Sequence, residues 1–124
     1  MNLNQVTLTV KNMEESVAFY KTLGFTIIVA EDHYSRFECP EGDATFSLYL
    51  GKPDSQNNSV IYFEHEDLDA WVEDLKQKGI EFVQEPKDQP YLWREAMLCD
   101  PSGNEIKLYW AGENRKNPPW RVKA

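Results

Sequence analysis

Three glutamates stand at alternating positions of segments with the apolar alternation of β-strands: Glu38, Glu64 and Glu95. Carboxylates that converge in a cavity can bind a cation. Alternatively, burial and like-charge repulsion can raise the pKa of one carboxyl towards the value that suits a general base. If the chain is an enzyme that uses a glutamate in this way, Glu64 and Glu95 are the candidate catalytic residues.

Cations and aromatic side chains occupy the same alternating positions. Aromatic side chains with polar tips are typical of the wall of a small-molecule pocket. The alternative is that these positions form a solvated sheet face. The predicted ligand-binding residues are Gln5, Thr7, Arg36, Glu38, Ser47, Tyr49, Tyr62, Glu64, Trp93, Glu95, Lys107 and Tyr109.

The elements that must position these residues come from a repeat. The pattern of residues 6–25 returns, without a gap, 55 positions later. Each copy has apolar alternation, a helix cap (Asn12 or Asp67), an apolar stripe at helical spacing, and then a glycine (Gly24 or Gly79). A repeat of fixed period indicates one supersecondary unit used twice.

Three further strands are expected after each helix. They cover about residues 25–30, 34–39 and 44–50 in the first copy, and 80–85, 93–99 and 105–110 in the second. The apolar residues of each strand must cover the neighbouring helix, so the residues between them face the other way. The sequence thus predicts one domain over 1–124, with modules at about 4–51 and 59–110, a linker at 52–58 and a tail at 111–124.

Composition narrows the functional class. The net charge of −8 opposes binding to nucleic acid or to an anionic membrane. No apolar run is long enough to span a bilayer and no signal peptide is evident, which favours a cytoplasmic protein. For Cys39 and Cys99 we expect free, buried thiols, with a disulfide as the alternative.

Several motifs carry a family resemblance. The first copy contains Phe19-Tyr20 and Leu23-Gly24-Phe25, and the second contains Glu66-Asp67-Leu68-Asp69 and the turn Asp100-Pro101-Ser102-Gly103-Asn104 before an apolar strand. Over residues 5–110 the chain resembles the vicinal oxygen chelate superfamily of glyoxalases, bleomycin-resistance proteins and dioxygenases. The resemblance implies an α+β fold of two βαβββ modules whose curved mixed sheets enclose a cavity.

The resemblance also implies where metal ligands would lie, and those positions here hold Gln5, Ser47, Val60 and Lys107. A serine is a poor ligand, a valine has no donor, and a lysine repels a divalent cation, so we expect no metal and no cofactor. Of the two histidines, His65 takes a core-facing position, and His33 lies in a loop, with the cavity mouth as its alternative place.

We therefore predict a metal-free protein, most like the bleomycin-resistance branch, that binds a small organic ligand in the inter-module cavity. The alternatives are a glyoxalase-like lyase or isomerase with atypical metal ligands, an enzyme with a glutamate general base, and a protein-interaction module. We also expect a homodimer, and Trp120 in the tail is predicted to anchor onto the body or onto a partner subunit.

Overall fold

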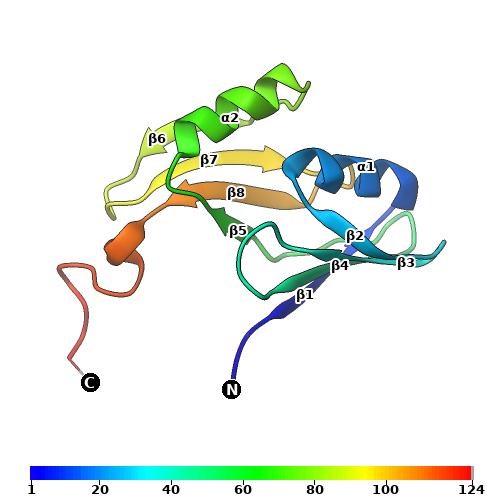
Figure 1. Ribbon diagram of the computed structural model, residues 1–124, viewed down its shortest axis with the longest axis horizontal. Helices are drawn as coiled ribbons and strands as arrows, with labels where there is room; N and C mark the ends of the chain where they lie inside the picture. Colours follow the sequence, from blue (N-terminus) through cyan, green and yellow to red (C-terminus); the bar gives the residue numbers. More distant parts are fainter. Residues whose placement is uncertain (124) are drawn as a thin grey trace. The chain divides into compact units, whose positions relative to one another are not determined.

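The computed structural model describes residues 1–123 and contains two four-stranded mixed sheets, each with one α-helix (Figure 1). The chain divides into two compact units. The first consists of Met1–Ser59 together with Asp100–Asn104, and the second of Val60–Cys99 together with the residues from Glu105 on.

The first unit is a βαβββ module with strand order β1-β4-β3-β2. Strands β1 and β4 are parallel, and the other pairs are antiparallel. Its elements are β1 (Gln5–Val10), α1 (Met13–Leu23), β2 (Thr26–Ala30), β3 (Tyr34–Glu38) and β4 (Thr45–Leu50).

Helix α1 begins and ends as its sequence predicts. The Asn12 side chain accepts a hydrogen bond from the Glu15 backbone N–H at 2.9 Å, which satisfies one of the free amides of the first turn. Gly24 follows the last helical residue with a φ of 113°, a left-handed conformation that favours glycine.

Aromatic packing forms the core of this unit. The buried ring of Tyr20 on α1 contacts Phe25, Phe37 and Phe46, with ring centroids 6.0, 6.2 and 4.8 Å away. Such pairs add about 0.5–1.5 kcal/mol each beyond the burial of their area. The helix is thereby fixed on one face of the sheet, and the other face remains for polar residues.

The second unit repeats the arrangement, with strand order β5-β8-β7-β6 and β5 parallel to β8. Leu68, Val72 and Leu75 form the buried stripe of its helix. The α+β fold of paired βαβββ modules is thus confirmed. The elements are β5 (Ile61–Glu64), α2 (Leu68–Gln77), β6 (Gln84–Asp88), β7 (Arg94–Cys99), β8 (Glu105–Trp110) and the 3-10 helix η1 (Gly112–Arg115).

One local prediction is wrong in this unit, and another holds only in part. Strand β6 covers Gln84–Asp88 rather than residues 80–85, because Ile80 still belongs to the end of α2: its N–H donates to the Leu75 carbonyl at 3.0 Å. Asp67 occupies the N-cap position but makes no capping hydrogen bond through its side chain. Its own backbone N–H donates to Nδ1 of His65 at 2.9 Å instead.

Three further predictions concern the cysteines, the tail and membrane crossing. Both cysteines are free thiols, but Cys39 is only partly buried and Cys99 is exposed, so the expectation that both are buried is wrong. Trp120 is 55 % exposed, and its role as an anchor onto the body or a partner subunit stays a prediction. No helix of residues 1–123 is long and apolar enough to cross a membrane.

Candidate functional site

The strand register of the second unit places five of the candidate residues on one sheet face. Tyr62 lies opposite Lys107 and Glu64 opposite Tyr109 in the β5–β8 pair. Glu95 lies opposite Tyr109 in the β7–β8 pair. Residues opposite one another in a ladder share a face, so these five side chains point to the same side, away from the apolar stripe that faces α2.

Aromatic rings cluster on this face. Trp93 stacks on Tyr109 with ring centroids 4.7 Å apart and an interplanar angle of 23°. Tyr62 contacts both rings edge-on, at 5.9 Å and 5.5 Å. The indole N–H of Trp93 donates to the Asn114 carbonyl at 3.4 Å, which helps to fix the orientation of the stacked ring. We call these three residues the aromatic cluster.

A charged pair lies beside the aromatic cluster. The ammonium of Lys107 is 3.7 Å from Oε1 of Glu95 and 5.5 Å from the ring centre of Tyr62. The Glu95 side chain is 5 % exposed and that of Lys107 is 23 % exposed. Burial alone would lower the pKa of Lys107, but the charge of Glu95 and the contact with Tyr62 outweigh it, so the pKa is raised. Lys107 is therefore a cation at neutral pH.

Glu95 has one occupied and one free carboxylate oxygen. The hydroxyl of Tyr91 donates to Oε1 at 2.7 Å. Burial, together with this hydrogen bond to a carboxylate, raises the pKa of Tyr91 to about 12, so the phenol keeps its proton at neutral pH. Oε2 of Glu95 is buried and has no hydrogen-bond partner among the described residues.

Glu64 differs from Glu95 because its carboxylate is already used. Oε2 accepts from the backbone N–H groups of Ala111 and Gly112 at 2.9 and 3.1 Å, and Oε1 lies 3.8 Å from Nε of Arg115. These contacts fix the start of η1. Glu95 is consequently the better placed of the two proposed catalytic candidates, since only it retains a free acceptor.

The sheet of the first unit carries a separate polar cluster. Gln5 Nε2 donates to Ser47 Oγ at 2.7 Å, and Ser47 Oγ is 2.7 Å from the hydroxyl of Tyr34, which accepts from Arg36 Nε at 2.9 Å. The hydrogen bond with Ser47 lowers the pKa of Tyr34, and the bond and charge of Arg36 add to this against a smaller effect of burial. The cluster offers a phenol beside a cation.

The remaining predicted residues of this sheet share its polar face. Thr7 lies opposite Ser47 in the register, Tyr49 lies opposite Tyr34, and Glu38 lies opposite Thr45. Tyr49 is 52 % exposed. Glu38 lies in the first unit and Glu64 and Glu95 lie in the second, so within each unit the predicted trio of carboxylates is at most a pair.

The residues at the implied metal positions do not fit a divalent cation. The amide of Gln5 is engaged with Ser47 and Thr45, Val60 has no donor atom, and Lys107 presents an ammonium group. Residues 1–123 contain no group of three or more His, Cys, Asp or Glu side chains that could hold a metal ion. His33 is exposed beside Glu31, and His65 stacks against Trp71 with centroids 5.6 Å apart.

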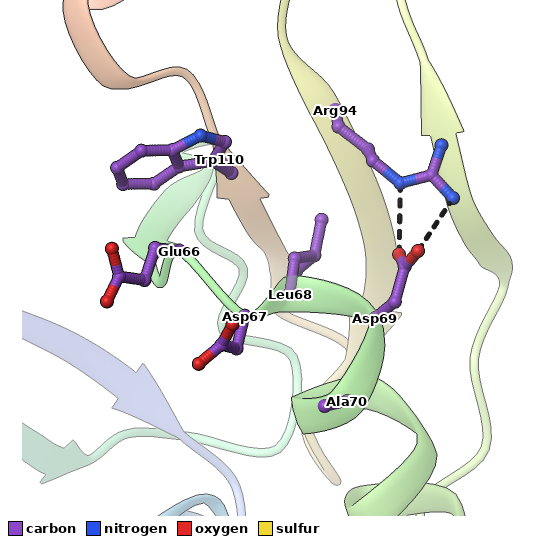
Figure 2. A pocket seen from close by; sticks show the side chains of 7 residues that line it. All are labelled: Glu66, Asp67, Leu68, Asp69, Ala70, Arg94 and Trp110. Carbon is purple, nitrogen blue, oxygen red and sulfur yellow. Dashed lines mark hydrogen bonds and ion pairs between the residues drawn. The ribbon is translucent and has the colours of Figure 1, made fainter.

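A pocket of about 340 Å³ lies at the start of α2 (Figure 2). Arg94, on the helix-facing side of β7, binds Asp69 through two hydrogen bonds of 2.9 and 3.1 Å and also reaches Asp88. Its donors are thus committed to protein carboxylates, and we assign no ligand to this pocket. It is lined by Glu66, Asp67, Leu68, Asp69, Ala70, Arg94 and Trp110.

Two residues of these clusters were missed in the sequence. Tyr34 lies two positions before Arg36, and Tyr91 lies two positions before Trp93. Tyr34 is the first residue of the expected strand 34–39, and Tyr91 lies one step of the alternation before the expected strand 93–99. The signal was present in the spacing, but both residues fell at or beyond a predicted strand boundary.

Comparison with known proteins adds the family context. A family model described as the Glyoxalase/Bleomycin resistance protein/Dioxygenase superfamily matches residues 2–108. An uncharacterized protein of Bacillus subtilis strain 168, YraH, is 30 % identical over 125 residues, covering 88 % of this chain and 98 % of its own length.

Solved structures share the fold at low identity. A glyoxalase/bleomycin resistance protein/dioxygenase from Nocardioides is 22 % identical with a TM-score of 0.79, covering 99 % of this chain and 90 % of that one. A lactoylglutathione lyase from Agrobacterium tumefaciens is 16 % identical with a TM-score of 0.72, covering 88 % and 92 % of the two chains. At these identities the likeness concerns the fold alone.

Proposed function

The chain belongs to the glyoxalase/bleomycin resistance protein/dioxygenase superfamily, and we propose that it binds a small organic ligand without a metal ion. The ligand has a planar body that packs on the aromatic cluster and an anionic group that pairs with Lys107. The superfamily fold hosts many chemistries, so this proposal depends on the site and not on the fold.

One observation carries the proposal: a stacked aromatic pair and a largely buried cation share a single sheet face. Trp93 and Tyr109 present flat rings, Tyr62 contacts both edge-on, and the ammonium of Lys107 lies 5.5 Å from the ring centre of Tyr62. Planar surfaces with a few well-placed polar groups are typical of small-molecule sites. The Lys107 side chain is 23 % exposed and the ion-pair partner of its ammonium, Glu95 Oε1, is 3.7 Å away, so the ammonium gains from a second anion.

A second function has an observation of its own. The free Oε2 of Glu95 would suit proton transfer by a general base, as in an enzyme that uses no metal. A carboxylate in this role must reach the proton that it removes. Solvent-proton exchange of a bound carbon acid, lost in Glu95→Gln, would favour this alternative over simple binding.

The experiment compares two carboxylates of equal charge and different shape. We expect benzoate to bind more tightly than cyclohexanecarboxylate in calorimetric titrations, since only the flat ring can stack. In Trp93→Leu we expect benzoate to lose about 0.5–1.5 kcal/mol of binding free energy. Trp120→Leu, which removes an exposed tryptophan of the tail, is the matched control and should leave benzoate binding unchanged. If benzoate does not bind, or binds no better than the saturated acid, the proposal is wrong.

A further inference from the structure

A buried carboxylate oxygen without a partner is the least satisfied group of the second unit. Glu95 is 3 % exposed, and its Oε2 has no hydrogen-bond partner among the described residues. Leaving such an acceptor unpaired destabilises the protein, and more so when the group is charged. Nearly all buried polar groups in proteins are paired. An unpaired oxygen on a face with other binding features therefore indicates a hydrogen bond that a ligand would make.

The neighbours of Glu95 leave Oε2 for a ligand. Tyr91 O–H donates to Oε1, and Lys107 also approaches Oε1, at 3.7 Å. Both protein partners therefore serve the same oxygen. Tyr91 is 41 % exposed and lies in the turn between β6 and β7, and exposed side chains change rotamer within nanoseconds. We take the path of a ligand ring to Oε2 to lead past Tyr91, whose movement would break its hydrogen bond to Oε1.

We infer that Glu95 accepts a hydrogen bond from the ligand, and that the ligand is an aromatic acid with an N–H or O–H donor next to its carboxylate. The inference rests on the proposed function and names its ligand class. The carboxylate and the donor of the ligand must be neighbours, because their partners in the protein, the Lys107 ammonium and the Glu95 carboxylate, are only a few ångströms apart. A donor on the far side of the ring cannot meet Glu95 while the carboxylate meets Lys107.

The charges of Glu95 and Lys107 favour the same class of ligand. Glu95 and Lys107 together are neutral, so a ligand that brings only an anion leaves the carboxylate of Glu95 facing a second negative group. A donor beside the ligand carboxylate places partial positive charge against Oε2 and removes that conflict. Hydrogen bonds to a charged acceptor are the strong ones, worth more than those between neutral groups.

Three benzoates that differ only in an amino group test the inference. Benzoate, 2-aminobenzoate and 4-aminobenzoate are each titrated into the full chain by calorimetry. We expect 2-aminobenzoate to bind about tenfold more tightly than benzoate, and 4-aminobenzoate to resemble benzoate. In Glu95→Gln the side chain can present an amide N–H in place of Oε2, so the preference for 2-aminobenzoate should vanish. Glu105→Gln is the matched control. The charge of Glu105 also raises the pKa of Lys107, but the substitution should leave the preference for 2-aminobenzoate intact.

The outcomes separate the two proposals. If benzoate binds and 2-aminobenzoate binds equally well in the wild type, the inference is overturned while the proposed function stands. Binding of none of the three probes removes both. The wild-type comparison needs no variant, so it remains decisive even if Glu95→Gln fails to fold. An unchanged preference in a folded Glu95→Gln would also overturn the assignment of Glu95.

Discussion

The hydroxyl of Tyr20 donates to Oδ2 of Asp100 at 2.7 Å, and this hydrogen bond joins residues 80 positions apart within the first unit. Tyr20 is fully buried, and burial with the nearby charge of Asp100 raises the pKa of its phenol, so the donor keeps its proton. Asp100 also accepts from the backbone N–H groups of Ser102 and Asn104, each at 2.9 Å. One carboxylate thus organises the whole Asp100–Asn104 turn.

This relationship predicts two unequal losses of stability. Tyr20→Phe removes one donor and should cost about 1–2 kcal/mol of unfolding free energy. Asp100→Ala strands several buried donors at once and should cost about 3 kcal/mol or more. Asp43→Ala, at an exposed position of the corresponding turn after β3, is the control and should be close to neutral. Urea denaturation measures all three, and equal losses for Tyr20→Phe and Asp100→Ala would contradict the central role of the carboxylate.

The pKa of Tyr91 gives a prediction about pH. Burial and the bond to Glu95 raise this pKa to about 12, so between the ordinary tyrosine value and 12 the folded state holds a proton that the unfolded state has lost. The contribution of Tyr91 to stability is therefore complete at neutral pH and falls as the pH rises through this window. In Glu95→Gln the pKa should move part of the way back, since burial remains. Carbon-detected NMR of labelled tyrosines follows the titration, and an unchanged pKa in Glu95→Gln would show that Glu95 does not act on Tyr91.

The sequence predicted the fold well because its signals are local. Asn12 and Gly24 each act within a few residues of a helix end, and their capping roles are seen in the structure. The start of β6 was misplaced because the hydrogen bond between Ile80 and Leu75 extends the helix ending beyond Gly79. The sequence pattern there does not separate a helix end from a strand start.

The site was harder to predict than the fold. Strand parity placed Tyr62, Lys107 and Tyr109 on one sheet face, and in the β5–β8 register the three residues lie on one face. Parity does not say which carboxylate is already used, and Glu64 and Glu95 look alike in sequence. Only the backbone of Ala111 and Gly112, which folds back onto Glu64, distinguishes them. That contact depends on the path of the chain after β8.

Metal content is a direct test of the metal-free proposal. Because Lys107 and Val60 stand where the resemblance implies metal ligands, we expect well under one equivalent of zinc, nickel, iron or manganese per chain after purification without chelators. Elemental analysis gives the ratio. Near one equivalent of a transition metal that disappears in Gln5→Ala would show that the site uses unusual ligands.

Assembly is a separate prediction. We expect a symmetric homodimer, because each four-stranded sheet has edges that a partner can cover and Trp120 is 55 % exposed on the chain alone. Light scattering across a concentration series measures the mass in solution. In a dimer held by the tail, Trp120→Ala should shift the mass towards the monomer. A monomer mass for the wild type at every concentration would remove the prediction.

Lys107 provides the sharpest test of how the second unit binds an anion. In Lys107→Met the side chain keeps most of its length and loses its charge, so benzoate should bind more weakly by about 2 kcal/mol. This is the lower end of the range for buried charge pairs, since the side chain is still 23 % exposed. Lys78→Met is the matched control, because Lys78 pairs with Asp74 on the exposed surface of α2 and such pairs contribute little. The loss should shrink only slightly at high salt, because partly buried pairs are weakly screened. If calorimetry finds the same affinity in Lys107→Met as in the wild type, Lys107 does not contact the ligand, and the anion-binding role assigned to this sheet face is wrong.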